Sequence, residues 1–255
     1  MAILKIIGRK GSRSKLSIAR ETGIGLYKGL TRGKVDCIIN YGLAGQYLDA
    51  FIHKYPLINN IPTINRRVGL SKLHVIGLAK AADIDVPDSK LALSIKDDKD
   101  EFIEKRINSI GGRGICKAKG KGPIPGKYYQ HFIDNRRYEL RVHAFLWTDD
   151  WTIQKRLGDD DQISWNFEQG GRFATIHNPD NHGLFKRAKE IAAKVLKITN
   201  MAFGAVDFVV DEDRKIWFLE VNSSPGFTEL SGPIYVNAFN KLKKLPLKQV
   251  LQYTA

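Results

Sequence analysis

Three oxygen-bearing side chains, Asp207, Glu220 and Asn222, lie within two apolar, β-rich runs near the C-terminal end of the sequence. The polar segment 212–215 separates the runs, and this pattern predicts an antiparallel hairpin. In that hairpin Asp207 falls opposite Glu220, and Glu220 and Asn222 project from one face because side chains alternate along a strand. Facing carboxylates repel unless a cation lies between them, and Mg²⁺ prefers carboxylate and amide oxygens. The sequence therefore predicts a magnesium site, with a solvent-facing hairpin edge as the alternative.

A glycine-rich segment upstream has the composition of a phosphate-binding loop. The stretch KRINSIGGRGI begins with Lys105 and runs on to Gly111, Gly112, Arg113 and Gly114. Glycines let backbone N–H groups approach phosphate oxygens closely, and the lysine neutralises the charge of those oxygens. No GKS or GKT sequence ends the segment, so it is not a Walker loop, and alone it is weak evidence. Together with a magnesium site it indicates binding of a phosphate-bearing ligand.

Strands and helices must position these side chains, and the chain has an alternating α/β pattern. The turn-rich segment 59–67 predicts a boundary between a short α/β domain at 1–64 and a larger domain at 65–255. Apolar patterning predicts strands at 3–8, 35–42, 101–109, 127–134, 138–147 and 151–157, and helices at 45–55, 69–83 and 185–199.

Bulk composition excludes several classes of protein. With 255 residues, 43% of them hydrophobic, the chain can bury a substantial core and is not a disordered tail. No apolar run is long enough for a transmembrane helix, and the N-terminal apolar stretch precedes the basic one, which is the reverse of a secretory signal. We therefore expect a cytoplasmic protein without a membrane partner. The cysteines, Cys37 and Cys116, lack the paired spacing of a zinc site or a disulfide framework.

Positive charge is the unusual bulk property. The chain has 41 Lys+Arg against 27 Asp+Glu, a formal net charge of +14. Such a balance is typical of proteins with a polyanionic partner, whether nucleic acid, a phosphate-rich ligand or an acidic protein segment. Arg9, Lys10, Arg13 and Lys15 follow the first predicted strand, and we expect them to form a docking surface. A solvated loop is the alternative.

Six stretches in collinear order carry a resemblance to a known family. They are KRINSIGGRGI, YYQHFID, YELRVHAF, QKR, WNFEQGG and GAVDFVVD followed by FLEVNSSPGF. Over roughly residues 60–230 the set resembles the ATP-grasp superfamily, specifically the glutamate ligases that modify ribosomal protein and the related amino-group-carrier ligases. The resemblance implies an α/β (α+β) ATP-grasp fold. Two α/β subdomains, a lid at about 85–130 and a C-terminal subdomain at about 131–255, would clasp ATP behind the N-terminal domain.

The resemblance also implies a role for individual residues. Lys72 and Lys105 would hold the phosphates of ATP, and Asp207, Glu220 and Asn222 would bind Mg²⁺ as two ions, with Mn²⁺ as a substitute. The segment that meets adenine corresponds to Gln130, His131, Phe132 and Ile133. His131 stands where the family commonly has an acidic residue for ribose, and Asp134 is the substitute that we expect. Glu139 and Arg141 match a family D-x-R pair, and Arg156 and Asn166 match residues that approach the γ-phosphate and the acyl phosphate.

These parts predict an ATP-dependent carboxylate–amine ligase that works through an acyl phosphate. Its partners would be ATP, an amino acid or peptide substrate and an acidic protein or peptide acceptor. Two alternatives stay open: a phosphotransferase with the same ATP site, and a nucleic-acid-binding protein that retains the fold. Direct binding of nucleic acid is not favoured, because the phosphate lysines and the metal ligands are intact. The sequence leaves the oligomeric state open.

Overall fold

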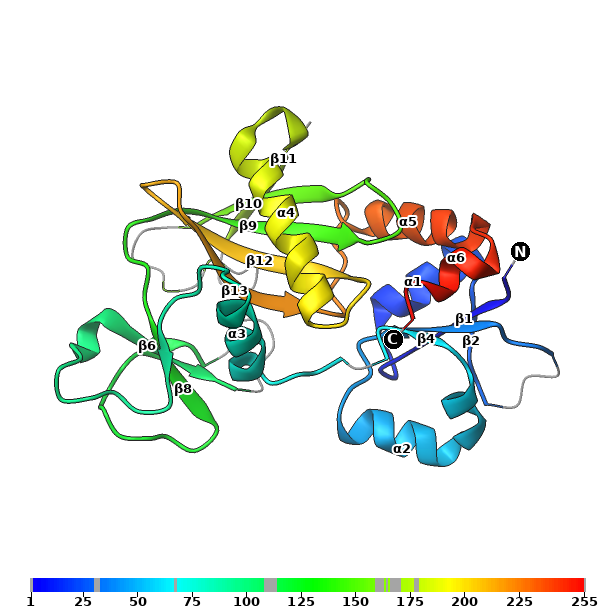
Figure 1. The fold of residues 1–255 in the computed structure, drawn as a ribbon, viewed down its shortest axis with the longest axis horizontal. Coiled ribbons are helices and arrows are strands. Elements are labelled where there is room, and N and C mark those ends of the chain that lie inside the picture. Colours follow the sequence, from blue (N-terminus) through cyan, green and yellow to red (C-terminus); the bar gives the residue numbers. More distant parts are fainter. Residues whose placement is uncertain are drawn as a thin grey trace.

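The computed structural model describes residues 2–29, 33–66, 68–107, 114–158, 163, 165, 171–176 and 179–254. Within these residues the chain forms three β-sheets, which follow one another along an elongated molecule (Figure 1). We call them the N-terminal sheet, the middle sheet and the lid sheet.

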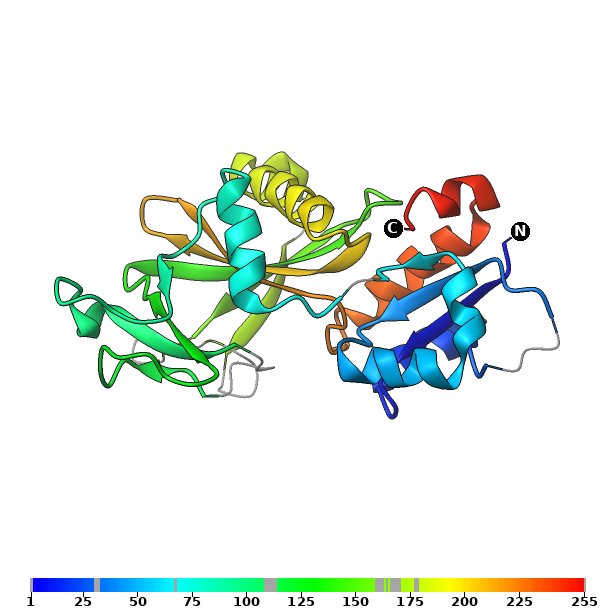
Figure 2. The ribbon, with the colours of Figure 1, turned by 60° about the horizontal axis from the view of Figure 1, so that its bottom comes forward.

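The N-terminal sheet has the strand order β2-β1-β3-β4, with parallel neighbours throughout. Its strands are β1 (Leu4–Gly8), β2 (Gly25–Leu26), β3 (Cys37–Tyr41) and β4 (Thr63–Ile64). Helix α1 (Arg13–Thr22) covers one face and α2 (Gln46–Lys54) covers the other (Figure 2). Because both faces of a parallel sheet are covered, every residue of the central strand β3 is buried.

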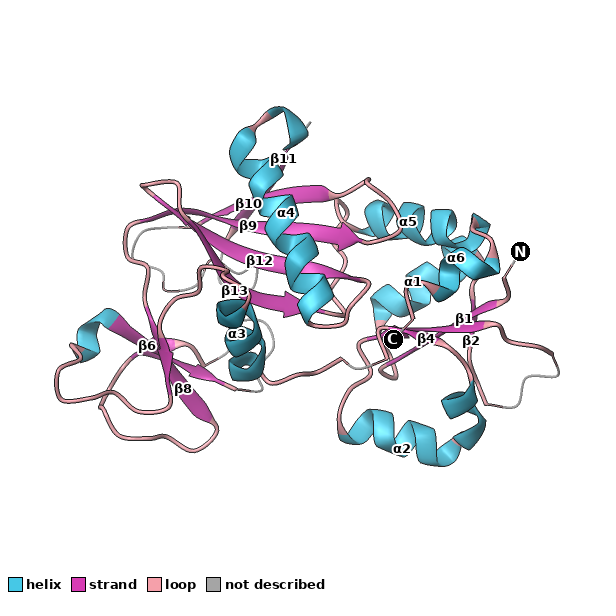
Figure 3. Cartoon of the chain, in the orientation of Figure 1, coloured by secondary structure: helices cyan, strands magenta, loops and turns pink. Residues whose placement is uncertain are grey.

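The middle sheet is antiparallel, with the order β11-β10-β9-β12-β13. Its strands are β9 (Arg136–Phe145), β10 (Thr152–Leu157), β11 (Arg172–Ile176), β12 (Phe203–Asp211) and β13 (Ile216–Asn222). Helices α3 (Lys72–Ala81) and α4 (Gly183–Ile198) pack on one face (Figure 3), against apolar residues that include Leu140, Val142 and Phe208. Side chains alternate along a strand, so the residues between these apolar positions project from the opposite face.

The lid sheet has the order β5-β8-β6-β7 and lies at the end of the molecule away from the N-terminus. Its strands are β5 (Ser89–Lys90), β6 (Phe102–Arg106), β7 (Cys116–Lys117) and β8 (Lys127–His131). One face buries a small core of Leu93, Phe102, Ala118 and Tyr129. Alternation turns Lys105 and Gln130 to the other face, where they line a pocket together with residues of the middle sheet.

The last two helices, α5 (Gly232–Lys244) and α6 (Leu247–Leu251), return to the N-terminal sheet. Tyr235, Phe239 and Val250 join one core with Ile6 and Ile18. The core also contains Phe145 and Phe203 from the middle sheet, so the two sheets share buried contacts. The division into domains at 1–64 and 65–255 stays a prediction, and the structure adds that the first 64 residues share their core with the C-terminal helices.

Most predicted strands and helices are confirmed, with ends that shift by a few residues. The helix predicted over 69–83 begins only at Lys72, because the Ser71 side chain caps it by accepting the His74 N–H. Strand β11 and helices α5 and α6 were not predicted. The signal for α5 was present, since Tyr235, Ala238, Phe239 and Leu242 are its buried residues and recur at helical spacing. None of the described helices combines the length and the apolar character that spanning a bilayer requires.

Phe239→Ala should destabilise the protein by about 3–5 kcal/mol, because the side chain is fully buried and its removal leaves a cavity. The Phe239 ring contacts those of Phe203 and Trp147 at the middle sheet, with centroids 5.2 and 5.5 Å apart. Phe239 also shares a core with Ile6 of the N-terminal sheet, so the loss would be felt in both sheets. Urea denaturation measures the free energy of unfolding. Tyr47→Ala is the control, since Tyr47 is 61% exposed. Equal effects of the two substitutions would contradict a shared core.

Candidate functional site

Polar side chains form rows across the face of the middle sheet opposite α3 and α4. Strand register aligns Gln154, Arg141, Asp207 and Glu220 on β10, β9, β12 and β13. A neighbouring row contains Arg156 on β10 opposite Glu139 on β9. The predicted opposition of Asp207 and Glu220 is therefore confirmed, and the register gives these residues a common polar face.

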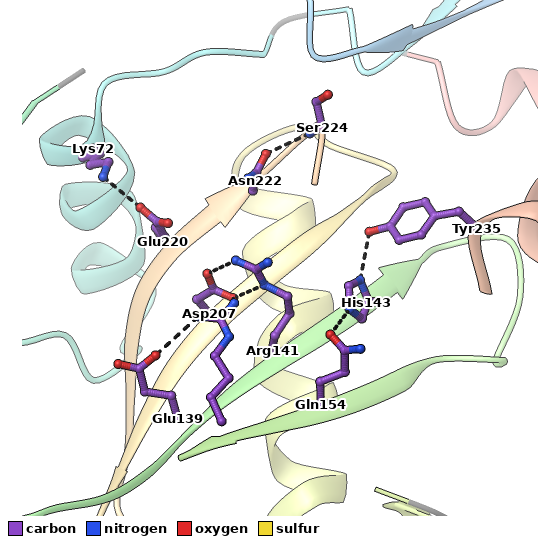
Figure 4. Close-up of polar contacts among 11 residues, drawn as sticks. Lys72, Glu139, Arg141, His143, Gln154, Asp207, Glu220, Asn222, Ser224 and Tyr235 are labelled. Atoms are coloured by element: carbon purple, nitrogen blue, oxygen red, sulfur yellow. Dashed lines mark hydrogen bonds and ion pairs between the residues drawn. The ribbon is translucent and has the colours of Figure 1, made fainter. Parts of the chain in front are cut away.

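Asp207 is 4% exposed, and two guanidinium groups hold its carboxylate (Figure 4). Arg141 donates from Nε to Oδ1 at 2.7 Å and from Nη2 to Oδ2 at 2.6 Å, and Arg156 donates from Nη2 to Oδ1 at 3.0 Å. Burial alone would raise the pKa of Asp207, but the two arginines outweigh it and lower this pKa to about 2. The alternative of a solvent-facing hairpin edge is therefore wrong for Asp207, and cations of the chain itself neutralise this carboxylate.

Glu220, opposite Asp207, and Asn222, two residues further along β13, are less buried than Asp207. Lys72, the first residue of α3, places its Nζ 2.9 Å from Glu220 Oε2, and the Glu220 side chain is 32% exposed. The Asn222 side chain accepts the Ser224 N–H at 2.9 Å through Oδ1. Lys72 thus reaches the polar face from a helix that covers the other side of the sheet.

The lid sheet contributes Lys105 and Gln130 from adjacent strands. Lys105 Nζ donates to Gln130 Oε1 at 2.8 Å, and Gln130 Nε2 donates to Ser89 Oγ at 3.1 Å. Burial lowers the pKa of Lys105 to about 8, although the charge of Glu220 acts in the opposite direction. Lys105 is therefore a buried ammonium group that loses its proton at a lower pH than an ordinary lysine does.

A pocket lies between the lid sheet and the polar face of the middle sheet. Of the predicted residues it brings together Lys72, Lys105, Gln130, His131, Phe132, Ile133, Arg156, Asp207 and Glu220. Arg141 joins this group through its ion pair with Asp207. Asp134 is placed differently, because it lines a neighbouring pocket with Asp88 and Trp217.

The segment from Gln130 to Ile133 links the lid sheet to the middle sheet and forms one edge of the pocket. His131 N–H donates to Asp88 O at 2.7 Å, and Phe132 N–H donates to Glu101 O at 2.8 Å. Within the described residues the Ile133 N–H has no acceptor, so it can donate to a ligand. Apolar walls stand beside it, formed by Ile103, Val209 and Leu219. A planar, hydrogen-bonding ring suits this end of the pocket.

Four predicted site residues, Gly111, Gly112, Arg113 and Asn166, lie outside the described residues. Gly114 is described and has a φ of +77°, a conformation that glycine adopts without strain. A Cβ at this position would approach Arg106 Nε to 2.9 Å. The backbone conformation favours glycine at position 114, whereas the flexible, exposed Arg106 side chain could move away from a Cβ.

A divalent cation fits Glu220 and Asn222 better than it fits Asp207. Asp207 Oδ1 already accepts two hydrogen bonds and Oδ2 accepts one, which leaves at most one lone pair for a metal. Among the described residues no group of three His, Cys, Asp or Glu side chains could hold a metal ion. The residues therefore fit Mg²⁺ only if oxygens of a ligand complete the coordination.

The charge around the pocket favours a polyanionic ligand. Among the described residues at the site, five cationic side chains accompany three carboxylates. The cations are Lys72, Lys105, Arg136, Arg141 and Arg156, and the carboxylates are Glu139, Asp207 and Glu220. A net positive pocket attracts phosphate groups and disfavours a bare metal ion.

Arg136 was not predicted, and Glu139 was predicted only as the partner of Arg141 in the family D-x-R pair. Arg136 lines the pocket and lies over the Trp165 ring, with its Cζ 3.9 Å from the ring centroid. Glu139 accepts from Arg156 Nη1 at 3.3 Å. The spacing of two residues from Arg141 was a signal for Glu139, since alternation places both on one face. No sequence signal separated Arg136 from its neighbour Arg137.

Comparison with known sequences matches the C-terminal part of the chain. Residues 174–242 match the family described as D-ala D-ala ligase C-terminus. Over 49 residues the chain is 47% identical to D-alanine–D-alanine ligase of Aquifex aeolicus (strain VF5). That match covers 19% of this chain and only 17% of the relative. The family match includes Asp207, Glu220 and Asn222 but neither Lys72 nor Lys105.

Solved structures resemble the whole chain. ATP-grasp ligase PsnB, complexed with a minimal precursor, has a TM-score of 0.64 and 13% identity over 94% of this chain and 100% of that one. D-alanine–D-alanine ligase from Bacillus anthracis has a TM-score of 0.61 and 15% identity over 99% of each chain. The chain has the ATP-grasp fold. Macrocyclase MdnC from Microcystis aeruginosa MRC, bound with precursor peptide MdnA, shares this fold with a TM-score of 0.60 and 12% identity over 96% of this chain and 100% of that chain.

The ATP-grasp fold agrees with the fold class predicted from the sequence. The pocket lies between the lid sheet and the middle sheet, where the two predicted subdomains would clasp a nucleotide. The narrower assignment, to ribosomal-protein-modifying glutamate ligases and amino-group-carrier ligases, stays a prediction.

Binding of ADP with Mg²⁺ to this ATP-grasp site should depend on pH through Lys105. Phosphate favours the ammonium form, so above a pKa of about 8 binding must first recruit a proton. Affinity should be level below that pH and should fall by at most about tenfold per pH unit above it. Isothermal titration calorimetry in buffers of different ionisation enthalpy measures both affinity and proton uptake.

Lys105→Met is the variant that isolates this effect. It should bind ADP more weakly at neutral pH and should lose the proton uptake on the alkaline side. If the wild-type protein binds without proton uptake at about pH 9, Lys105 does not meet the phosphates.

Proposed function

We propose that this protein is an ATP-dependent carboxylate–amine ligase, which forms an amide bond through an acyl phosphate. The observation that carries the proposal is the pocket where Lys72, Lys105 and Arg156 meet Asp207 and Glu220. The pocket combines one end suited to a planar ring with one end suited to phosphates and a metal ion. The sequence relative from Aquifex aeolicus, PsnB and the Bacillus anthracis protein are each named as ligases, which supports the same class of reaction here.

ATP would lie with its adenine at Ile133 and its phosphates beside Lys72 and Lys105. The Ile133 N–H donates to the base, and Ile103 and Leu219 pack against its faces. The ion pair with Glu220 places the Lys72 ammonium group at the pocket, beside the position proposed for the phosphates. Gln130 positions Lys105 through the hydrogen bond between their side chains.

Glu220 and Asn222 would hold Mg²⁺, with Asp207 offering its remaining lone pair. Phosphate oxygens would add to the ligands that the described residues offer. We include two ions, and exchange for Mn²⁺, in the proposal. Bound Mg²⁺ neutralises charge on the transferring phosphoryl group. Arg141 keeps Asp207 oriented and favours its ionised form.

The reaction proceeds in two displacements. A carboxylate oxygen of the first substrate attacks the γ-phosphorus, the bond to the β,γ-bridging oxygen breaks, and ADP leaves. An amine then attacks the acyl carbon, the C–O bond to phosphate breaks, and the amine loses a proton as the amide forms. Arg156 stabilises charge on the group in transfer, and we assign Asn166 to the acyl phosphate. Protein side chains need not act as nucleophiles, so positioning and exclusion of water are the main tasks of the site.

Hydroxylamine trapping tests the ligase proposal. The protein would be incubated with ATP, Mg²⁺, hydroxylamine and a pool of amino acids and Glu-containing peptides. An acyl phosphate reacts with hydroxylamine to give a hydroxamate, which mass spectrometry identifies. ADP release together with a phosphorylated product and no hydroxamate would support a phosphotransferase instead. Failure to bind or consume ATP would contradict both enzymes.

Arg156→Met should reduce the rate of the chemical step by about a hundredfold or more, because a charge partner of the transition state is lost. The affinity for ADP should change much less, since Lys72 and Lys105 remain. Single-turnover kinetics and calorimetry measure the two effects. Lys155→Met is the matched control, because Lys155 lies on the other face of β10 with its Nζ 4.4 Å from the Tyr138 ring centroid. Equal losses of rate and ADP affinity in Arg156→Met would contradict the assigned role.

The acceptor in this proposal is an acidic peptide or protein that docks on the loop after β1. Arg9, Lys10 and Arg13 are exposed there. Lys15 does not belong to the cluster, which corrects the prediction, because Lys15 is buried and its Nζ donates to Gly8 O and Arg9 O at 3.1 and 2.9 Å. The loop lies near the exit of β13, where Phe227 N–H donates to Ser14 Oγ at 3.1 Å. Complexes of PsnB and MdnC with precursor peptides support a peptide as substrate class.

Simultaneous Arg9→Ala, Lys10→Ala and Arg13→Ala substitutions should weaken binding of a labelled Glu-rich peptide and flatten its dependence on salt. Fluorescence anisotropy at increasing ionic strength measures both. ADP affinity should be unchanged, because these residues lie outside the nucleotide pocket. Alanine at Lys186, Lys194 and Lys197 is the control, since these lysines are exposed on α4. Equal peptide binding by the two triple variants would mean that the β1–α1 loop is only solvated.

A further inference from the structure

Three buried polar side-chain atoms in the described part of the chain have no hydrogen-bond partner: Tyr128 Oη, Gln154 Nε2 and Arg156 Nε. Folding leaves few such atoms, because a buried donor without an acceptor loses its bonds to water and gains nothing in return. Arg156 belongs to the site described above, and Gln154 lies in the same sheet row as Arg141 and Asp207. Tyr128 stands apart from them, on the lid sheet.

Strand register directs Tyr128 toward the nucleotide side of the lid sheet. Tyr128 pairs with Lys105 across β8 and β6, and it is two residues from Gln130 on β8, so all three side chains share one face. Lys105 and Gln130 line the pocket on that face. Tyr129 points the other way, into the small lid core, where its hydroxyl donates to Gly122 O at 2.7 Å. Among the described residues, one of two adjacent tyrosines therefore has an acceptor, and the other has none.

The surroundings of Tyr128 define the chemistry of the missing partner. The residue is 1% exposed, and burial together with the negative charge of Glu220 raises the pKa of its phenol far above the ordinary value. The hydroxyl therefore stays protonated and can donate. Glu220 is engaged by Lys72, and Lys105 is engaged by Gln130. An acceptor that enters between these groups meets an excess of positive charge, as a phosphate oxygen would require.

We propose that the Tyr128 hydroxyl donates a hydrogen bond to a phosphate oxygen of the bound nucleotide and so completes the cradle formed by Lys72 and Lys105. The inference rests on the proposed nucleotide site but does not depend on which carboxylate or amine the enzyme uses. The position of Tyr128 along β8 separates its hydroxyl from the site proposed for adenine. Tyr128 precedes His131 by three residues, roughly 10 Å in a β-strand, so it lies toward the phosphates and away from the adenine end at Ile133.

Tyr128→Phe tests the inference, and Tyr129→Phe is its matched control on the opposite face of the same strand. Calorimetry would measure the binding of ADP with Mg²⁺ and the binding of adenosine, which has no phosphates. Tyr128→Phe should weaken ADP binding about tenfold and leave adenosine binding unchanged, because one hydrogen bond to a charged acceptor is lost.

Thermal unfolding without ligand gives an independent readout. Tyr128→Phe should leave the melting temperature unchanged or raise it, because the variant removes an unsatisfied buried hydroxyl. Tyr129→Phe should lower the melting temperature, since it loses the bond to Gly122, and should not alter ADP binding.

Several results would overturn the inference. Wild-type affinity for ADP in Tyr128→Phe would show that the hydroxyl does not meet the nucleotide. Equal weakening of ADP and adenosine, or a lower melting temperature without ligand, would show that Tyr128 has only a structural role. If the wild-type protein bound neither ADP nor adenosine, the proposed nucleotide site would fail together with this contact, an outcome distinct from failure in the variant alone.

Discussion

The central constraint on this structure is the burial of the Asp207 carboxylate in the middle of a five-stranded sheet. A buried charge is strongly destabilising unless opposite charge and hydrogen bonds meet it. Arg141 supplies both from the neighbouring strand β9, and Arg156 supplies both from β10, one strand further away. A second guanidinium nitrogen of Arg156 donates to Glu139. The charged side chains of the polar face are therefore linked to one another by hydrogen bonds. Removal of one of them leaves the charge of another buried without its partner.

The alternation of side chains along a strand serves the core and the site together. On β9, Leu140 and Val142 pack on the helical side of the middle sheet, and Glu139, Arg141 and His143 project from the other. His143 continues the polar face inward, with Nε2 3.0 Å from Gln154 Oε1 and Nδ1 3.1 Å from Tyr235 OH. Tyr235 belongs to α5, so a chain of buried polar contacts joins the site to the C-terminal helices.

The junction between the N-terminal sheet and the middle sheet is formed by segments far apart in the sequence. Tyr41 OH, at the end of β3, donates to Pro225 O at 2.8 Å. Gly42 has a φ of +75°, and a Cβ there would approach Ser224 Cβ to 2.2 Å, so the backbone turn and the close contact both require glycine. Asn65 links the connection after β4 to the middle sheet by donating to Phe203 O and accepting from Ala202 N–H. These contacts fix the N-terminal sheet beside the loop that follows Asn222.

The sequence by itself determined the alternating strands, the hairpin and the facing of Asp207 and Glu220, because these depend on periodicity and turn residues that are local to the chain. The same local rules placed Lys72 on a helix and Lys105 on a strand, and the resemblance to the ATP-grasp superfamily selected Lys72 as a phosphate ligand. Only the tertiary structure decided that Lys72 meets Glu220, that Arg141 and Arg156 neutralise Asp207, and that Lys15 bonds to carbonyl groups instead of facing a partner. It also decided that α5 completes the N-terminal core and that Asp134 lies outside the main pocket. Ion pairs and burial depend on which elements pack together, and those contacts join residues whose separation along the chain carries no periodic signal.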